Sequence, residues 1–330
     1  MKFKQFILLL GLISWSLPGL AETYKLGLVE WMPWSTAYVA QQQGFWQDAG
    51  IDIIVKQFAN YETENLKAFE NHKTDFMLSM LGNVIEMINH SPEYVIIYEH
   101  DWSHGGDLFI LHQSLSRLEQ IQGKKIGVYT RSAPIQFFIK QVLDKAKINV
   151  NEVKLVEIAN TYDLNQAFKK GKLAAIVSYD PEASKSIKEK VGQLLFTSAD
   201  FPGVIPEGIS VQKPLLEKHP EVVKKFLQGW LRAVQWQADP SNKADFYTIL
   251  RKTMFSDHPH TDAELDALTT GGKIHTDLDT ILTSNQQDAP TYIKELLLYL
   301  QQTDQLIHSL QPQDYIQTQI AITAAQSIFK

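Results

Sequence analysis

The chain has 330 residues, a formal charge of −6 and no cysteine, and 44% of its residues are apolar. The missing cysteines exclude disulfide bonds, thiol nucleophiles and lipid attachment to an N-terminal cysteine. The negative charge argues against nucleic acid or an anionic membrane surface as a partner. The length suffices to bury one or two hydrophobic cores, which a chain without disulfides needs for stability.

Residues 1–21 have the pattern of an export signal. Lys2 and Lys4 precede an apolar run over 6–17, and a small-residue cleavage site follows at 19–21. An uncleaved membrane anchor is the other interpretation, but the apolar run is too short for a stable span. We therefore expect export to the periplasm, with this segment removed.

The mature chain begins with a strand, an aromatic loop, a helix and a second strand. Residues 24–29 alternate as a strand does, 37–43 are helical, and 51–55 form an apolar strand. Such a β-α-β unit predicts parallel strands with a right-handed crossover. Ligands of parallel sheets bind beyond the carboxyl ends of the strands, where the loop here carries Trp31 and Trp34.

Helical and strand-like patterns alternate up to about residue 210. A first block predicts helices over 60–71 and 81–89 and strands over 75–79, 94–98 and 107–111, with a polar stretch over 100–107. A second block predicts strands over 122–129, 153–158, 174–178 and 194–197, a helix opening at 130–134 and another over 164–170. From residue 214 onward the pattern predicts only helices, near 222–234, 241–254, 289–309 and 313–329, with a break at Gly271-Gly272.

Two α/β blocks followed by a helical tail predict an α/β fold with two lobes. The chain crosses between the blocks at about 101–108 and 200–208, which makes the first lobe discontinuous. The predicted boundaries are 22–104 plus 207–330 for lobe 1 and 105–206 for lobe 2. Lobes joined in this way close around a ligand, and we expect a monomer.

Seven short motifs make the chain resemble a known family. They are Trp31-Met32-Pro33-Trp34, Gly44-Phe45-Trp46, Gly50-Ile51-Asp52-Ile53, the crossing from Asp101 to Asp107, Gly123 to Val128, Gly171 to Ile176 followed by Tyr179-Asp180-Pro181, and His219 to Phe226. In order and spacing they are similar to the solute-binding proteins of nitrate, sulfonate and taurine ABC transporters. Binding proteins for thiamine-pyrimidine precursors belong to the same superfamily (NMT1/THI5-like, SsuA-like). The resemblance covers residues 24–250.

The resemblance implies a type II periplasmic binding protein with a hinge and a C-terminal helical tail. Such a protein captures a small polar solute between its lobes and delivers it to an ABC permease in the inner membrane. It uses no cofactor. Two alternatives stay open: a periplasmic sensor that docks on a membrane-bound signalling protein, and an exported enzyme on the same scaffold.

Catalytic signatures are missing from the sequence, so we expect no enzyme. It has no zinc-protease, nucleophile-elbow or Walker A motif. Eukaryotic pyrimidine synthases share the fold and a similar start, but their activity requires a cysteine-rich motif, and this chain has no cysteine.

Aromatic and acidic side chains mark the expected cleft. Stacking by tryptophans and charge-assisted hydrogen bonds from carboxylates suit an amine, an amidine or an aminopyrimidine. The alternative is that the tryptophans pack loops together and the carboxylates cap turns. The residues in question are Trp31, Trp34, Asp101, Trp102, Asp107, Tyr179 and Asp180, of which Asp180 is the acid we favour.

Predicted helix starts in the same region suit an anion instead. Their N–H groups would point into the cleft, which favours a sulfonate or nitrate. These starts contain Ser35 or Thr36, Ser79, Asn83, Thr130 and Ser132, with Arg131 as a candidate anion clamp. The sequence leaves the charge of the ligand open, with the three tryptophans and three acids favouring an aromatic or nitrogen-containing molecule.

A short histidine-containing segment was the remaining candidate for a metal site. His258 and His260 flank a proline, with Asp257 and Asp262 beside them. No third ligand at a fixed spacing is visible, so a solvated loop is the better interpretation and we expect no metal.

Overall fold

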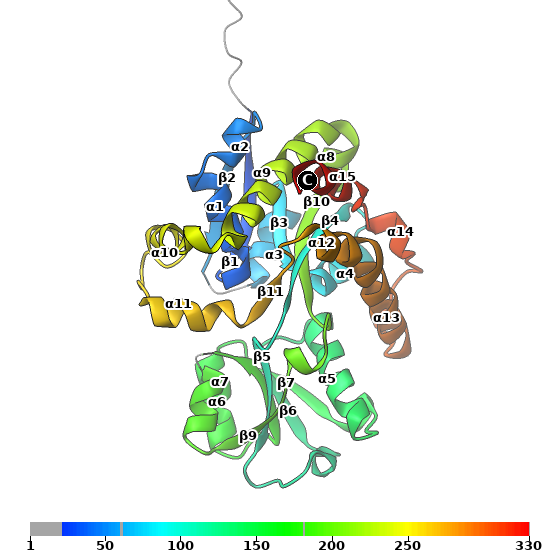
Figure 1. Ribbon diagram of the computed structural model, residues 1–330. Coiled ribbons are helices and arrows are strands. Elements are labelled where there is room, and N and C mark those ends of the chain that lie inside the picture. Colours follow the sequence, from blue (N-terminus) through cyan, green and yellow to red (C-terminus); the bar gives the residue numbers. More distant parts are fainter. Residues whose placement is uncertain (1–21, 60–61, 181, 330) are drawn as a thin grey trace, which may run out of the picture.

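The computed structural model describes residues 22–59, 62–180 and 182–329, and the predicted signal segment lies outside them. The chain forms two lobes, each built on one β-sheet (Figure 1). One sheet has six strands and the other five. Within the described ranges no helix is both long and apolar enough to cross a membrane.

The six-stranded sheet contains the N-terminal strands and two later additions. Its strand order is β11-β4-β10-β3-β1-β2. Strand β1 pairs in parallel with β2 and with β3, which confirms the predicted β-α-β unit. The strands are β1 (Thr23–Val29), β2 (Asp52–Phe58), β3 (Phe76–Met80), β4 (Tyr94–Ser103), β10 (Pro206–Gln212) and β11 (Gly272–Ile274).

Helices from both ends of the chain pack around this sheet. Between β1 and β2, the chain forms a 3₁₀ turn η1 (Met32–Ser35) and then α1 (Thr36–Gln42). Gly44, at φ +71°, ends α1, because this backbone conformation favours glycine. The other helices are α2 (Phe45–Asp48), α3 (Glu62–Glu70), α4 (Leu81–His90), α8 (Lys213–Lys218), α9 (Pro220–Ala238), α10 (Lys243–Lys252), α11 (Asp262–Thr269), α12 (Leu278–Thr283), α13 (Ala289–Gln302), α14 (Pro312–Tyr315) and α15 (Gln319–Ile328).

The five-stranded sheet forms the lobe drawn below in Figure 1. Its strand order is β7-β6-β8-β5-β9. The strands are β5 (Asp107–His112), β6 (Lys125–Val128), β7 (Lys154–Glu157), β8 (Ala175–Tyr179) and β9 (Gly192–Thr197), and the helices are α5 (Ala133–Lys145), α6 (Thr161–Lys169) and α7 (Glu182–Lys188). All strands of this sheet come from 107–197, within the segment predicted for lobe 2.

The two chain crossings differ from the expected polar loops. Strand β4 continues through the predicted crossing as far as Ser103, and β10 begins at Pro206. Residues 101–103 form a strand instead of a loop because β4 pairs with β10 on one edge and with β11 on the other. The crossings are therefore short, over 104–106 and 198–205.

The region predicted to be only helical also contributes a strand. Residues Gly272 to Ile274 form β11 and pair antiparallel with Ser103, Trp102 and Asp101 of β4. The predicted helix break at Gly271-Gly272 is thus the start of a strand at the crossing between the lobes.

One hydrophobic core belongs to each lobe and a third joins the lobes. The joining core lies where α4 and α13 pack against α5. In it, the ring of Phe137 on α5 lies between the rings of Tyr292 and Tyr299 on α13, at 5.7 and 5.9 Å between ring centroids. The C-terminal region therefore holds lobe 2 through aromatic contacts.

Truncation of Phe137 tests this contact. We expect Phe137→Ala to lower the free energy of unfolding by about 3–5 kcal/mol, because a buried ring leaves a cavity. Chemical denaturation measures the change. The matched control is Leu298→Ala on α13, whose side chain is 49% exposed and whose loss should change stability by less than about 0.5 kcal/mol. Equal effects of the two substitutions would contradict the proposed packing.

Candidate ligand-binding site

Four acidic side chains gather where β4 and β10 cross between the lobes. Asp101 is on β4 and Glu207 on β10, directly opposite one another in the sheet. Asp107 starts β5 in lobe 2, and Glu62 starts α3 in lobe 1. Each of the other three acids raises the pKa of Glu207, which places each of them within electrostatic reach of Glu207. We call these four residues the acidic cluster.

Asp101 and Glu207 form the most buried pair of the cluster. Their side chains are 0% and 5% exposed, and the two residues pair across the strands. Asp101 Oδ2 accepts a hydrogen bond from Trp31 Nε1 at 3.2 Å. Burial raises the pKa of Asp101 to about 7, although its interactions with Glu207 and the Trp31 indole lower it. Burial, followed by the charge of Asp101, raises the pKa of Glu207 well above its ordinary value.

A bulge in the ladder brings this pair together. The register between β4 and β10 shifts between Glu207 and Gly208, so that Gly208 pairs with Glu99 while Glu207 pairs with Asp101. Bulges commonly redirect side chains next to functional sites. A side chain at Gly208 would collide with the backbone, because its Cβ would lie 2.1 Å from the carbonyl oxygen of Tyr98.

Asp107 is held by hydroxyl groups from both lobes. Its Oδ2 accepts from Ser103 Oγ and its Oδ1 from Tyr129 OH, each at 2.8 Å. Ser198, before β10, lies 2.8 Å from Ser103 and accepts from the backbone N–H of Gly105. Burial raises the pKa of Asp107, while the two hydroxyl donors lower it. Ser103 and Ser198, at the two chain crossings, are therefore linked to the Asp107 carboxylate by hydrogen bonds.

Glu62 forms the lobe 1 wall of the cluster and was not anticipated from the sequence. Its Oε1 accepts from Ser79 Oγ and, at 3.2 Å, from Asn83 Nδ2. Burial raises the pKa of Glu62 to about 7 against these hydrogen bonds. Ser79 and Asn83 were predicted to face the ligand at a helix start, and here they orient a carboxyl group.

The indole of Trp31 fits a slot made by glycines. A Cβ on Gly106 would lie 2.5 Å from Trp31 Cη2, and one on Gly272 would lie 3.2 Å from Trp31 Cζ2. Gly271 borders the same slot, and its carbonyl oxygen accepts from the backbone N–H of His104. Trp31 therefore contacts the crossing and β11 while its N–H points to Asp101.

Trp34 and Ser35 lie behind Trp31 in the core, at 2% and 0% exposed. Ser35 is the N-cap residue of α1 but its side chain makes no capping hydrogen bond. The loop is fixed by His100, whose Nε2 lies 3.1 Å from the carbonyl oxygen of Pro33 and whose Nδ1 accepts from Trp230 Nε1. Burial lowers the pKa of His100 to about 3, so it stays neutral and supports the loop structurally.

The remaining predicted residues lie at different distances from the cluster. Trp102 is 9% exposed and packs its ring against His104, with Lys273 Nζ 5.8 Å from its centroid. Thr130 and Ser132 precede α5, where Thr130 Oγ1 accepts from the Ser132 backbone N–H. The exposed Asp180 accepts from the backbone N–H of Ser184 in α7.

Two tyrosines connect these positions to the cluster. Tyr179 packs edge-on against Tyr129, at 4.9 Å between ring centroids, and Tyr129 donates its hydroxyl hydrogen to Asp107. Tyr179 also pairs with Asp107 across β5 and β8. The structure therefore brings Trp31, Asp101, Asp107 and Tyr179 close together, and it gives Asp180 a helix-capping position.

The segment considered for a metal site, residues 257–262, interacts with Arg251 instead. Arg251 Nε donates to the His260 carbonyl oxygen, and its guanidinium forms an ion pair with Asp262. Within 22–59, 62–180 and 182–329, no three histidine or acidic side chains are arranged to hold a metal ion.

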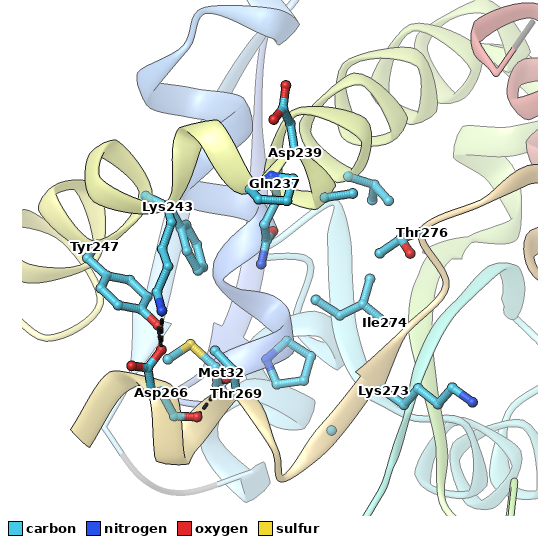
Figure 2. A pocket seen from close by; sticks show the side chains of 16 residues that line it. Met32, Gln237, Asp239, Lys243, Tyr247, Asp266, Thr269, Lys273, Ile274 and Thr276 are labelled. Atoms are coloured by element: carbon cyan, nitrogen blue, oxygen red, sulfur yellow. Dashed lines mark hydrogen bonds and ion pairs between the residues drawn. The ribbon is translucent and has the colours of Figure 1, made fainter. Parts of the chain in front are cut away.

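A separate pocket of about 450 Å³ lies on lobe 1 between α9, α10, α11 and β11 (Figure 2). Met32 and Pro33 border it, and two of its charged groups, Lys243 and Asp266, are paired with each other. Tyr247 OH donates to Asp266 at 2.6 Å, and Lys243 Nζ lies 2.6 Å from the same carboxylate. None of the acidic cluster lines this pocket.

The fold and the sequence both resemble those of known binding proteins. Two α/β lobes joined by crossing strands are the architecture of the periplasmic binding proteins. The sequence matches the family described as NMT1/THI5 like over residues 33–244, and the chain belongs to that family. This confirms the resemblance based on the short motifs.

One curated relative shares part of the sequence. It is the Bacillus subtilis (strain 168) protein described as binding protein YtlA, 20% identical over 210 residues. The match covers 62% of this chain and 63% of that protein, so it spans less than two thirds of the relative's length.

Solved structures share the fold over nearly the whole chain. The aliphatic sulphonate-binding protein SsuA of Escherichia coli has a TM-score of 0.70 and 13% identity, covering 91% of this chain and 99% of that one. The nitrate-binding protein NrtA of Synechocystis PCC 6803 has a TM-score of 0.67 and 14% identity, covering 93% and 89%. The ligand-binding component of an ABC-type import system from Staphylococcus aureus, with zinc bound, has a TM-score of 0.70 and 11% identity, covering 92% and 99%.

The raised pKa values predict how stability depends on pH. A carboxyl group whose pKa is higher in the folded state stabilises the fold below its unfolded pKa, near 4, and this contribution is lost as the pH rises through the folded value. For Asp101 the window runs from about 4 to about 7. We expect Glu207→Gln to melt a few degrees higher than the wild type above about pH 7. Below about pH 4 the two should melt alike.

Differential scanning calorimetry across this window measures the effect. The control is Glu119→Gln, which removes an exposed acid in lobe 2. A wild-type melting temperature that stays parallel to that of Glu207→Gln at every pH would show that the pair carries no buried charge.

The slot around Trp31 gives a second prediction. Gly106→Ala would place a Cβ 2.5 Å from Trp31 Cη2 and 2.7 Å from the Gly271 carbonyl oxygen. We expect a loss of about 1–3 kcal/mol in unfolding free energy and a change in tryptophan fluorescence. In the control Gly271→Ala, the nearest contact of the new Cβ is 3.5 Å, so both readouts should stay close to the wild type. Equal changes in stability and fluorescence in the two variants would show that Gly106 does not make room for the Trp31 indole.

Proposed function

We propose that this protein is the periplasmic binding component of an ABC import system. It captures a small polar solute between its lobes and delivers it to a permease in the inner membrane. The family, the two-lobed fold and the export-signal pattern at 1–21 support this role. Asp101, Asp107 and Glu207 are buried between the two crossings, so a ligand would reach them only after the lobes separate.

The ligand we propose carries a positive charge or several N–H donors, as an amine, an amidine or an aminopyrimidine does. The observation that carries this choice is the acidic cluster. Buried carboxylates repel an anion and attract a cation, and the attraction is strengthened by the low dielectric of a closed site. The indole of Trp31 and the rings of Tyr129 and Tyr179 add aromatic surface beside it.

A thermal-shift experiment on residues 22–330 tests both parts of the proposal. We expect benzamidine or 2-aminopyrimidine to raise the melting temperature by a few degrees, since a ligand at 100 times its Kd adds about 2.7 kcal/mol. Ethanesulfonate, taurine and nitrate should leave it unchanged. Asp101→Asn should weaken the response at least tenfold in ligand concentration, because it removes a charge at the centre of the cluster.

The control variant is again Glu119→Gln, which should respond as the wild type does. A shift with the anions and none with the cations would keep the binding role and refute the ligand class. No shift with any compound of either class would refute the binding role itself and favour a protein partner, as for a sensor.

A further inference from the structure

We infer that a cationic ligand enters the acidic cluster in exchange for a proton shared by Asp101 and Glu207. This inference rests on the proposed function, since it concerns how the same site takes its ligand. It makes the strength of binding depend on the pH of the surrounding medium.

The geometry of the pair requires a proton. Asp101 and Glu207 pair across β4 and β10 and are both buried. Two ionised carboxylates have only acceptor atoms, so these side chains can hydrogen-bond to each other only when one of them carries a hydrogen. Asp101 Oδ1 and Glu207 Oε2 are both closed off from solvent, and no N–H or hydroxyl group of the described residues donates to either. A buried oxygen in this position is costly unless it has a proton or a donor beside it.

The surroundings supply too little positive charge to replace that proton. Glu99, also on β4, raises the pKa of Asp101, whereas His275, next to β11, lowers it. However, His275 is paired with Glu99 at 3.0 Å, so its charge is already balanced. On the other side, Asp107 of β5 and Glu62 of α3 both raise the pKa of Glu207. The uncharged neighbours are the Trp31 indole, which donates to Asp101, and the hydroxyls of Tyr98 and Tyr129.

A cationic ligand can replace the shared proton, because it brings both a positive charge and an N–H donor. When the lobes open, an N–H of the ligand donates to the freed carboxylate oxygen, the shared O–H bond breaks, and the proton leaves to water. No covalent bond forms between ligand and protein, and the net charge of the pair with its occupant is unchanged. Lowering the pH therefore competes directly with the ligand.

Infrared spectroscopy tests the first half without any ligand. At about pH 6 the wild type should show the carbonyl band of a protonated, buried carboxylic acid. The band should lose intensity in the double variant Asp101→Asn/Glu207→Gln, where Glu62 keeps a band of its own, and stay unchanged in Glu119→Gln. A band that the double variant leaves unchanged overturns the inference, and that result leaves the proposed binding function standing.

Calorimetry with benzamidine tests the second half, because this probe keeps its charge throughout the range. Titrations in buffers of different ionisation enthalpy should report release of about one proton, and the affinity should rise about tenfold per pH unit between about pH 5 and 7. Glu207→Gln leaves Asp101 ionised with an amide donor beside it, so the proton release and the pH slope should both fall sharply while binding persists. A merely structural role for Glu207 would weaken binding and leave the slope intact.

The remaining outcomes also decide the question. Binding of benzamidine without proton release overturns the exchange and keeps the cationic ligand class. A protonated pair that binds benzamidine at neither about pH 6 nor about pH 8 is a structural element, and this too overturns the exchange. Binding of ethanesulfonate in its place would refute the ligand class on which the inference rests.

Discussion

The pairing of β4 with β10 is the constraint on which the site depends. These two strands adjoin the crossings at 104–106 and 198–205, and their ladder makes Asp101 and Glu207 face one another out of contact with water. Burying acids without a counter-charge is unfavourable, so this part of the fold costs stability. The hydrophobic contacts of α5 with α4 and α13 offset that cost elsewhere in the molecule. The contacts that stabilise the fold therefore lie apart from the acidic cluster.

Much of the fold follows from local pattern. The sequence predicted the parallel pairing of β1 with β2, the alternation of elements to about residue 210 and the apolar face of α9. Burial gives each of these elements a periodic pattern of apolar residues. Strand β11 could not be predicted from the sequence. Its three residues are too few to show a period, and they form a strand only because the edge of β4 is open to them.

The site was predictable to a smaller extent. The loop containing Trp31 and the crossing containing Asp101 and Asp107 stood out, because aromatic and acidic residues at strand ends are uncommon without a role. Glu62 and Glu207 gave no such signal, since a glutamate at a helix start or near a glycine usually faces solvent. Their position depends on a bulge and on long-range pairing, which no single segment encodes. Asp180, the acid favoured from the sequence, has a capping role that its neighbours satisfy locally.

The late position of β11 also has a consequence for synthesis. A chain emerging from the ribosome can complete the five-stranded sheet once residue 197 is available, since all its strands precede that point. The six-stranded sheet must wait for residues 206–212 and then for 272–274, which lie far from their partners along the chain. Contacts of such long range form slowly. Lobe 1 thus stays incomplete until most of the chain exists, and one edge of β3 stays unpaired until β10 has been made.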